Sequence, residues 1–278
     1  MDTRFWGPSG WKLLHLVTFD YARHEEEPQT RKKIADYREF FRTLPYILPC
    51  KFCRSSLTDY YRQNPFRASQ DMRKWMYDIH NCVNDKLRKQ GLHPSSNPPY
   101  HKVKEFYEAW LECDWQTHLV TFWDFLFAVA YNHPKDTYSQ SAPMPDCPPE
   151  VHRCKDKCEK NKWNVLPLKD RLYWFTRFWS YLPVVLPSSM GNMWKEVQKT
   201  NPPTLGCRPS TLAWLWRMRC ALDADFQDPY TSVCKRIATY SSDCAKKKRA
   251  ITCRRRKAPT ERRKAKATET KRRTKKAK

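Results

Sequence analysis

Two cysteines, Cys50 and Cys53, are separated by two residues and follow directly after Pro49. On the first turn of a helix this spacing puts both sulfurs on one face, and a proline before them suits a helix start. The N-terminus of a helix favours a thiolate, as do the charges of Lys51 and Arg54, so we expect a lowered pKa for Cys50. We also expect Cys50 to be the more exposed sulfur and Cys53 to face the core. Such a pair suits thiol–disulfide exchange.

The same Cys-x-x-Cys pattern is also found in zinc knuckles and in structural disulfides. A zinc ribbon needs a second knuckle, and the chain has no second Cys-x-x-Cys, since Cys154 and Cys158 are separated by three residues. Taken alone, the pair leaves redox and zinc chemistry about equally open.

A second motif begins about 20 residues later, at Trp75, and contains several polar residues. His80 and Asn84 lie one helical turn apart on the flank of an apolar stripe, and Lys86 and Lys89 follow. An ordinary core helix with polar residues at its solvent edge shows the same pattern. A binding site for a flat ligand that carries phosphates would show it too. The stripe consists of Met72, Trp75, Met76, Ile79, Val83 and Leu87.

With these two patterns, residues 7–15 complete a resemblance to the FAD-linked sulfhydryl oxidases of the Erv/ALR type. The motifs are Gly-x-x-x-Trp-x-x-x-His at the N-terminus, then Cys-x-x-Cys, then Trp-x-x-x-x-His-Asn-x-Val-Asn-x-Lys-Leu. The resemblance covers about residues 1–112 and implies a bundle of four helices and a short fifth, with FAD between them. It implies a flavin site that consists of Gly7, Trp11, His15, Trp75, His80, Asn81, Val83, Asn84, Leu87 and Tyr107, with Lys86 and Lys89 near the phosphates, and it implies no metal site.

The resemblance also implies a mechanism. Reduced protein dithiols would attack the Cys50–Cys53 disulfide at Cys50, and Cys53 would pass two electrons to FAD and then to O2, giving H2O2. A second cysteine pair often relays electrons in this family, and Cys154 with Cys158 is the candidate relay pair. The first two helices present apolar faces that cannot all be buried in one small bundle, and family members usually dimerise there, so a homodimer is expected. A second disulfide of the family would join the positions of Tyr77 and Tyr100, which suggests that both of its cysteines were lost together.

The composition indicates an all-α protein. The chain has 278 residues with only five Gly, too few for a dinucleotide-binding α/β fold, while 12 Trp and 21 Pro indicate short packed helices. Periodicity predicts helices over 8–23, 30–44, 50–62, 69–90 and 100–112. Residues 115–131 are predicted to form one buried helix rather than a membrane span. We therefore expect an oxidase domain at 1–112 and a second small helical domain at 113–245.

The C-terminal residues 246–278 are predicted to be a disordered basic tail. They hold 18 Lys or Arg and two Glu, a net +16 of the chain's +24. Such a tail could bind nucleic acid or another polyanion, or act as a nuclear address. The main alternative to an oxidase is therefore a nucleic-acid-binding or virion structural protein whose Cys-x-x-Cys is structural or binds zinc.

No secretory signal, transit peptide or membrane span is visible, so we expect a cytoplasmic protein. In that reducing compartment a dithiol is more often catalytic than structural. An oxidase of this kind with an additional helical domain and a basic tail resembles the versions carried by large cytoplasmic DNA viruses. The expected location is then the host cytoplasm or the virion.

Overall fold

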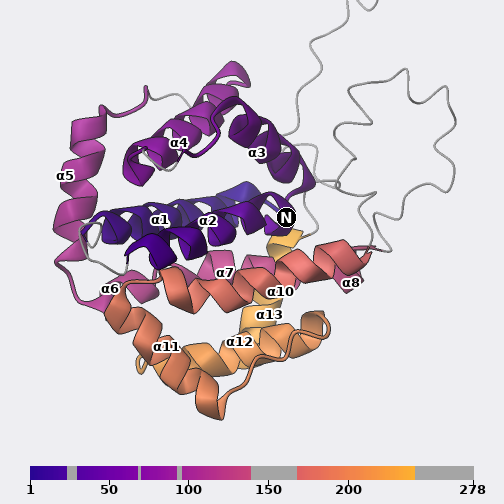
Figure 1. The fold of residues 1–278 in the computed structure, drawn as a ribbon. Helices are drawn as coiled ribbons and strands as arrows, with labels where there is room; N and C mark the ends of the chain where they lie inside the picture. The colour runs from indigo at the N-terminus through magenta and orange to yellow at the C-terminus, as the bar shows by residue number, and fades with distance from the viewer. Residues whose placement is uncertain (24–29, 68–69, 93–95, 139–167, 242–278) are drawn as a thin grey trace, which may run out of the picture.

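The computed structural model describes residues 1–23, 30–67, 70–92, 96–138 and 168–241, with the backbone alone at 30–33, 51 and 137–138. Within these ranges every regular element is a helix (Figure 1), which confirms the all-α prediction. The N-terminal helices are α1 (Thr3–Arg23), α2 (Thr30–Ile47), α3 (Lys51–Gln63), α4 (Met72–Lys89) and α5 (Tyr100–Leu111). The later helices are α6 (Trp115–Leu119), α7 (Trp123–Tyr131), α8 (Pro134–Tyr138), α10 (Leu168–Val185), α11 (Ser188–Thr200), α12 (Arg208–Leu222) and α13 (Tyr230–Ser241).

The first five helices match the predicted bundle, with shifted ends. Helix α1 begins at Thr3 and contains Pro8, although Pro8 was expected at its first position. Helix α2 continues through Pro45 to Ile47 instead of ending at residue 44. A proline removes one backbone hydrogen bond, and burial of Leu44 and Ile47 in the core provides contacts on both sides of Pro45.

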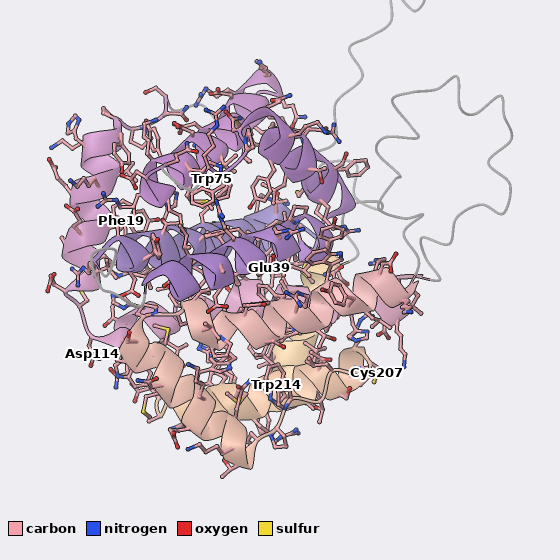
Figure 2. All side chains as sticks on the ribbon, in the orientation of Figure 1. Phe19, Glu39, Trp75, Asp114, Cys207 and Trp214 are labelled. Carbon is pink, nitrogen blue, oxygen red and sulfur yellow. The ribbon has the colours of Figure 1, made fainter. Side chains whose placement is uncertain are left out.

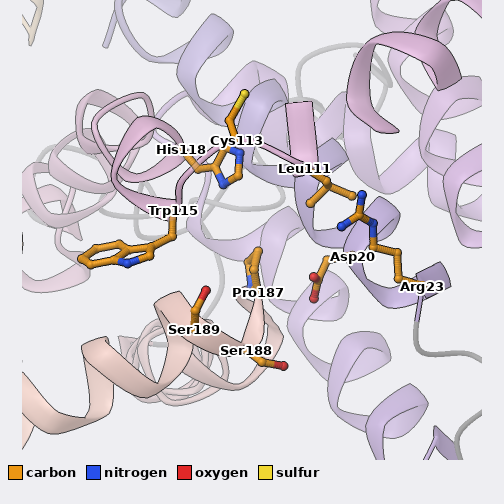
Figure 3. Close-up of a pocket in the computed structure, with 9 residues that line it drawn as sticks. All are labelled: Asp20, Arg23, Leu111, Cys113, Trp115, His118, Pro187, Ser188 and Ser189. Carbon is orange, nitrogen blue, oxygen red and sulfur yellow. The ribbon is translucent and has the colours of Figure 1, made fainter. Parts of the chain in front are cut away.

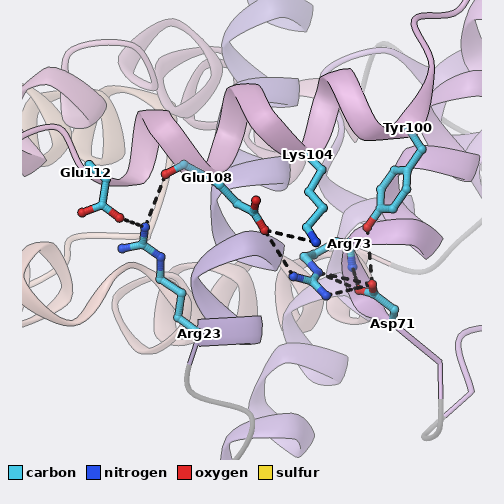
Figure 4. A network of polar contacts seen from close by, with 7 residues as sticks. All are labelled: Arg23, Asp71, Arg73, Tyr100, Lys104, Glu108 and Glu112. Atoms are coloured by element: carbon cyan, nitrogen blue, oxygen red, sulfur yellow. Dashed lines mark hydrogen bonds and ion pairs between the residues drawn. The ribbon is translucent and has the colours of Figure 1, made fainter.

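A polar network attaches α5 to α4 and to the end of α1 (Figure 4). Asp71 caps α4 by accepting a hydrogen bond from the Arg73 backbone N–H at 2.8 Å, and it also accepts one from the Tyr100 hydroxyl at 3.3 Å. Arg73 and Glu108 approach to 3.7 Å. At the other end of α5, Arg23 donates to the Glu108 carbonyl at 3.3 Å. These contacts hold α5 across the ends of two other helices.

Residues 115–131 form two helices, so the prediction of one continuous buried helix was wrong. The chain turns between α6 and α7, and the short α6 precedes a fully buried α7. Ser9 of α1 stabilises this turn, because its hydroxyl donates to the Thr121 carbonyl at 2.7 Å and accepts from the Phe125 N–H at 3.1 Å. A side chain 112 residues earlier in the chain therefore determines where this apolar segment bends.

The later helices pack against the N-terminal bundle (Figure 1), and buried aromatic side chains such as Trp214 lie among them (Figure 2). Helix α7 packs on α1 and α10 packs on α2. Phe178 of α10 lies between Phe40 of α2 and Phe125 of α7, with ring centroids 5.6 and 6.2 Å away. The core continues through Trp179, Trp194 and Trp214, each of which is at most 1% exposed.

Helix α13 contacts the N-terminal end of the chain. The Asp2 N–H donates to the Tyr240 carbonyl at 3.0 Å, and the rings of Phe5 and Tyr240 stack at 4.6 Å. The domain boundary at residue 113 stays a prediction. The predicted tail at 246–278 lies outside the described residues.

Replacing Gly191 by alanine should destabilise the packing of α11 on α10. A Cβ at Gly191 would lie 2.6 Å from the Pro183 carbonyl oxygen, closer than van der Waals contact allows, so the helices must separate. We expect a loss of about 1–3 kcal/mol in the free energy of unfolding, measured by urea denaturation. Gly7→Ala is the matched control, because a Cβ there meets nothing within 4 Å. Equal urea midpoints for the two variants would contradict this prediction.

Candidate active site

The dithiol lies where the connection from α2 enters α3. Cys50 is the N-cap of α3 in an extended conformation, with φ −118° and ψ 123°, and Cys53 lies in the first turn. Cys50 is 4% exposed and Cys53 is half-buried, so the predicted order of exposure was wrong. Local helix geometry favours exposure of the first sulfur, but Leu48 and Cys50 pack together into the core.

A buried arginine lies directly after the dithiol. Arg54 is 7% exposed, and its Nη1 donates to the Leu48 carbonyl oxygen at 2.6 Å. Its backbone N–H donates to the Cys50 carbonyl at 3.0 Å, which places Arg54 one helical turn after Cys50. The buried guanidinium of Arg54 thus stabilises the turn before Cys50 from its core side.

Aromatic and imidazole rings of three helices meet beside α4. The imidazoles of His15 and His80 are joined through Nε2 of His15 and Nδ1 of His80 at 2.9 Å. The ring of Trp11 stacks on His80 with centroids 3.9 Å apart, and Tyr107 stacks on His15 at 4.8 Å. Helices α1, α4 and α5 thereby bring together four predicted site residues, which we call the ring cluster: Trp11, His15, His80 and Tyr107.

His15 is the most deeply buried member of the ring cluster. It is 1% exposed, and burial followed by the proximity of His80 lowers the pKa of His15 well below its usual value. The ring is therefore neutral at pH 7. Its Nδ1 atom is buried without a hydrogen-bond partner, a state that normally costs about 1–3 kcal/mol.

The neutral His15 makes stability depend on pH. The unfolded histidine takes up a proton below about pH 6.5, whereas the folded one does not, so stability present above that pH is lost as the pH falls. We expect a loss of up to about 1.4 kcal/mol per pH unit below 6.5, measured by urea unfolding between about pH 5 and pH 7. His15→Gln should reduce this slope. His101→Gln replaces an exposed histidine of α5 and is the control, for which the slope should equal that of the wild type. An unaltered slope in His15→Gln would refute the assignment.

The polar residues of α4 face α3 and the following loop. The Asn84 side chain is buried, and its Nδ2 donates to the Asn97 Oδ1 at 3.2 Å. Lys86 Nζ donates to the Ser56 hydroxyl of α3 at 2.6 Å. Asn84 therefore contacts the loop before α5 and Lys86 contacts α3, and Asn97 is a contact that no sequence motif indicated.

Trp75 belongs to the hydrophobic core. It is 2% exposed, its Nε1 donates to the Asn64 carbonyl at 2.9 Å, and the rings of Phe41, Tyr61 and Phe66 surround it at 5.2–5.3 Å. The predicted apolar stripe of α4 is buried at its first four positions. The remaining predicted residues are half-buried or exposed along α1 and α4: Gly7, Asn81, Val83, Leu87 and Lys89.

Tyr77 and Tyr100 are in contact, as expected for positions that a disulfide would join. Their ring centroids are 5.2 Å apart, and Lys74 lies over both rings at 5.1 and 5.8 Å. The Tyr77 hydroxyl also donates to the Pro98 carbonyl at 2.8 Å. Two aromatic rings and a cation therefore connect α4 to the start of α5 at this point. The relay candidates Cys154 and Cys158 lie outside the described residues.

A cavity of about 220 Å³ lies at the end of the bundle, away from the predicted site residues (Figure 3). None of those residues lines it. His118 is buried at its wall and bonds the Trp110 carbonyl through Nε2 at 2.6 Å. The lining residues are Asp20, Arg23, Leu111, Cys113, Trp115, His118, Pro187, Ser188 and Ser189.

The described ranges hold neither a metal site nor a membrane span. They contain no cluster of three or more His, Cys, Asp or Glu side chains placed to hold a metal ion. No helix in the same ranges has the length and hydrophobicity needed to cross a bilayer.

Comparison with known proteins agrees with this arrangement. The model of the Erv1/Alr family matches residues 8–110. The FAD-linked sulfhydryl oxidase of African swine fever virus is 33% identical over 89 residues, which cover 31% of this chain and 70% of the viral protein. The chain belongs to the Erv1/Alr family. All predicted site residues of α1, α4 and α5 except Gly7 fall within the match to the family model.

Other relatives share the same segment. The putative FAD-linked sulfhydryl oxidase 347L of Invertebrate iridescent virus 6 is 31% identical over 101 residues, covering 33% of this chain and 87% of that protein. The mitochondrial FAD-linked sulfhydryl oxidase ERV1 of Saccharomyces cerevisiae is 32% identical over 90 residues, covering 32% of this chain. The chain spans 46% of the yeast protein, about half its length. No solved structure matches, and α6 to α13 lie beyond the family match.

Proposed function

We propose that this chain is an FAD-dependent thiol oxidase that makes disulfides in protein substrates. The observation that carries the proposal is the placement of the Cys50–Cys53 dithiol on α3, which packs on the helix that brings His80 to the ring cluster. Membership of the Erv1/Alr family, with relatives named FAD-linked sulfhydryl oxidases, supports it.

The residues present fit a flavin. Nδ1 of His15 is a buried polar atom that lacks a partner, and the polar edge of a flavin ring could provide one. Trp11 and Tyr107 offer flat apolar faces, and the amide of Asn84 adds a hydrogen-bonding group. We assign FAD to α1, α4 and α5, with Lys86 and Lys89 on the phosphate side.

When bound, FAD would accept two electrons from the dithiol and pass them to O2, which gives H2O2. The residues of the chain orient the site and limit the access of water. The neutral ring of His15 and the ring of His80 orient the site through the hydrogen bond between them, and Trp11 limits access of water to it.

Substrate access to the dithiol is restricted. Attack at Cys50 was predicted because that sulfur was expected to be exposed, but it is 4% exposed and Cys53 is half-buried. In the proposed mechanism a substrate thiolate therefore reaches Cys50 only when the structure around it opens locally. A reduced protein with two thiols is the proposed substrate, and O2 is the final acceptor.

The homodimer stays a prediction. The apolar faces of α1 and α2 on which it was based are covered by α7 and α10 of the same chain, so the argument for a dimer through these faces does not hold. Relatives from African swine fever virus and Invertebrate iridescent virus 6 support a viral source, with action in the host cytoplasm or the virion.

The visible absorption spectrum of the purified full-length chain tests the proposal. We expect a flavin band near about 450 nm that bleaches on addition of a dithiol without oxygen and returns in air with formation of H2O2. A colourless protein that contains zinc would refute the proposal and favour the structural or zinc-binding alternative.

A further inference from the structure

The loop before α5 is attached to α4 at two neighbouring points. The Tyr77 hydroxyl of α4 donates to the Pro98 carbonyl at 2.8 Å. One residue earlier, Asn97 contacts the last turns of α4, and its place before a proline favours an extended backbone there. Since α4 carries His80 and α5 carries Tyr107, this loop connects two helices that contribute to the ring cluster.

The side chain of Asn97 joins three residues of α4. Its Oδ1 atom accepts hydrogen bonds from Arg88 Nη1 at 3.0 Å and from Asn84 Nδ2 at 3.2 Å. Its Nδ2 atom donates to Asp85 Oδ1 at 3.3 Å. Arg88 and Asp85 also form an ion pair with each other. One half-buried amide therefore contacts a cation, an anion and a second amide.

The charged pair determines the orientation of the Asn97 amide. A guanidinium can only donate hydrogen bonds and a carboxylate can only accept them. Arg88 therefore requires the amide oxygen on its side, and Asp85 requires the amide nitrogen. The opposite orientation would place donor against donor and acceptor against acceptor. The oxygen of Asn97 is thus fixed as the atom that faces Asn84.

The fixed oxygen of Asn97 in turn determines the orientation of Asn84. The Asn84 amide must present its Nδ2 atom to that oxygen, which leaves its own Oδ1 atom for a further contact. Among the described residues, no N–H or O–H group donates to Oδ1 of Asn84. Asn84 is 8% exposed and lies one helical turn after His80, on the same face of α4. A buried amide oxygen normally has a hydrogen-bond partner, and a ligand beside α4 could provide it.

We propose that Asn97 is a positioning residue: it holds the Asn84 amide with its oxygen available, so that this part of the site accepts a ligand N–H and disfavours a ligand carbonyl. That the ligand is FAD rests on the proposed function. FAD has two groups of this kind, the N3–H of the flavin ring and the amino group of adenine. None of the three sequence motifs contains Asn97.

The test compares the affinities of the flavin-free full-length chain for FAD and for two analogues, measured by the change of flavin fluorescence on binding. N3-methyl FAD lacks one donor, and FAD with hypoxanthine in place of adenine lacks the other. We expect the wild type to bind one of the analogues about tenfold more weakly than FAD, because the Asn84 oxygen then loses its partner. In Asn97→Leu the Asn84 amide can turn, so this difference should fall below about twofold.

Two further variants show whether the orientation of the amide is responsible. Asn97→Asp keeps an oxygen toward Arg88 and Asn84 and should retain the wild-type difference. Ser96→Ala is the matched control at an exposed position of the same loop and should behave as the wild type. Equal binding of FAD and both analogues by the wild type, or the full difference in a folded Asn97→Leu variant, overturns the proposal. If Asn97→Leu does not fold, Asn97→Ala takes its place with the same criterion.

A second measurement needs no flavin, so it separates this inference from the proposed function. In the chain labelled with 15N-asparagine, the side-chain NH2 signals of Asn84 are identified by their loss in Asn84→Asp. Their exchange with water should become about tenfold faster in Asn97→Leu and stay unchanged in Ser96→Ala. A wild type that binds no FAD but shows this effect refutes the FAD proposal and keeps the role of Asn97. A wild type that binds FAD while Asn97→Leu leaves the exchange unchanged keeps the FAD proposal and overturns that role.

Discussion

Replacing Cys53 by serine should abolish reduction of the flavin by a dithiol. The serine hydroxyl cannot form a disulfide with Cys50, so electrons from a substrate have no covalent path into the site. We expect the rate of anaerobic bleaching near about 450 nm to fall by about 10³-fold or more. Stopped-flow absorbance with dithiothreitol measures this rate, and the amount of bound flavin should stay unchanged.

Cys82→Ser is the matched control for this experiment. Cys82 is half-buried like Cys53 and lies on α4, which packs on α3. Burial raises the pKa of its thiol, so it is a poor nucleophile at pH 7. Bleaching within about twofold of the wild-type rate is expected for this variant. Rapid bleaching in Cys53→Ser would show that electrons enter by another route.

Trp75→Ala should strongly destabilise the N-terminal bundle. The side chain is 2% exposed and lies among Phe41, Tyr61 and Phe66. Its removal leaves a large cavity and the Asn64 carbonyl without its indole donor. We expect a loss of about 3–5 kcal/mol in the free energy of unfolding, measured by urea denaturation.

Trp216→Ala is the appropriate comparison, because Trp216 also donates its indole N–H to a backbone carbonyl, that of Asp228 at 3.0 Å, but is only half-buried. It should cost about 1–2 kcal/mol. Trp75→Phe should keep most of the stability and tests the predicted flavin contact separately. If Trp75→Phe retains the fold but loses flavin, Trp75 contributes to the site as well as to the core.

Helix positions in the N-terminal half could be predicted because amphipathic periodicity is a local property. The stripe from Met72 to Ile79 repeats at helical spacing and is buried as expected. The break within residues 115–131 depends on a distant contact. Ser9 bonds Thr121 and Phe125 and separates α6 from α7, and no pattern within residues 115–131 contains that information.

The environment of the dithiol could be predicted only in part. The position of Cys50 and Cys53 at the start of α3 could be predicted, because a helix N-terminus depends on residues that are neighbours in the sequence. Arg54 was named from the sequence as a charge near Cys50, because it lies one helical turn after that residue. Its burial could not be predicted, because burial depends on contacts between helices.

Taken by itself, the sequence determined the all-α class, the position of the dithiol on the chain and the set of residues on α1, α4 and α5 that form the ring cluster. These features depend on residue type and short-range spacing, which the linear chain contains in full. The tertiary structure alone decided that Cys50 is buried and that α7 and α10 cover the faces of α1 and α2. Burial is the result of contacts among several helices, and these contacts join segments that lie far apart in the chain.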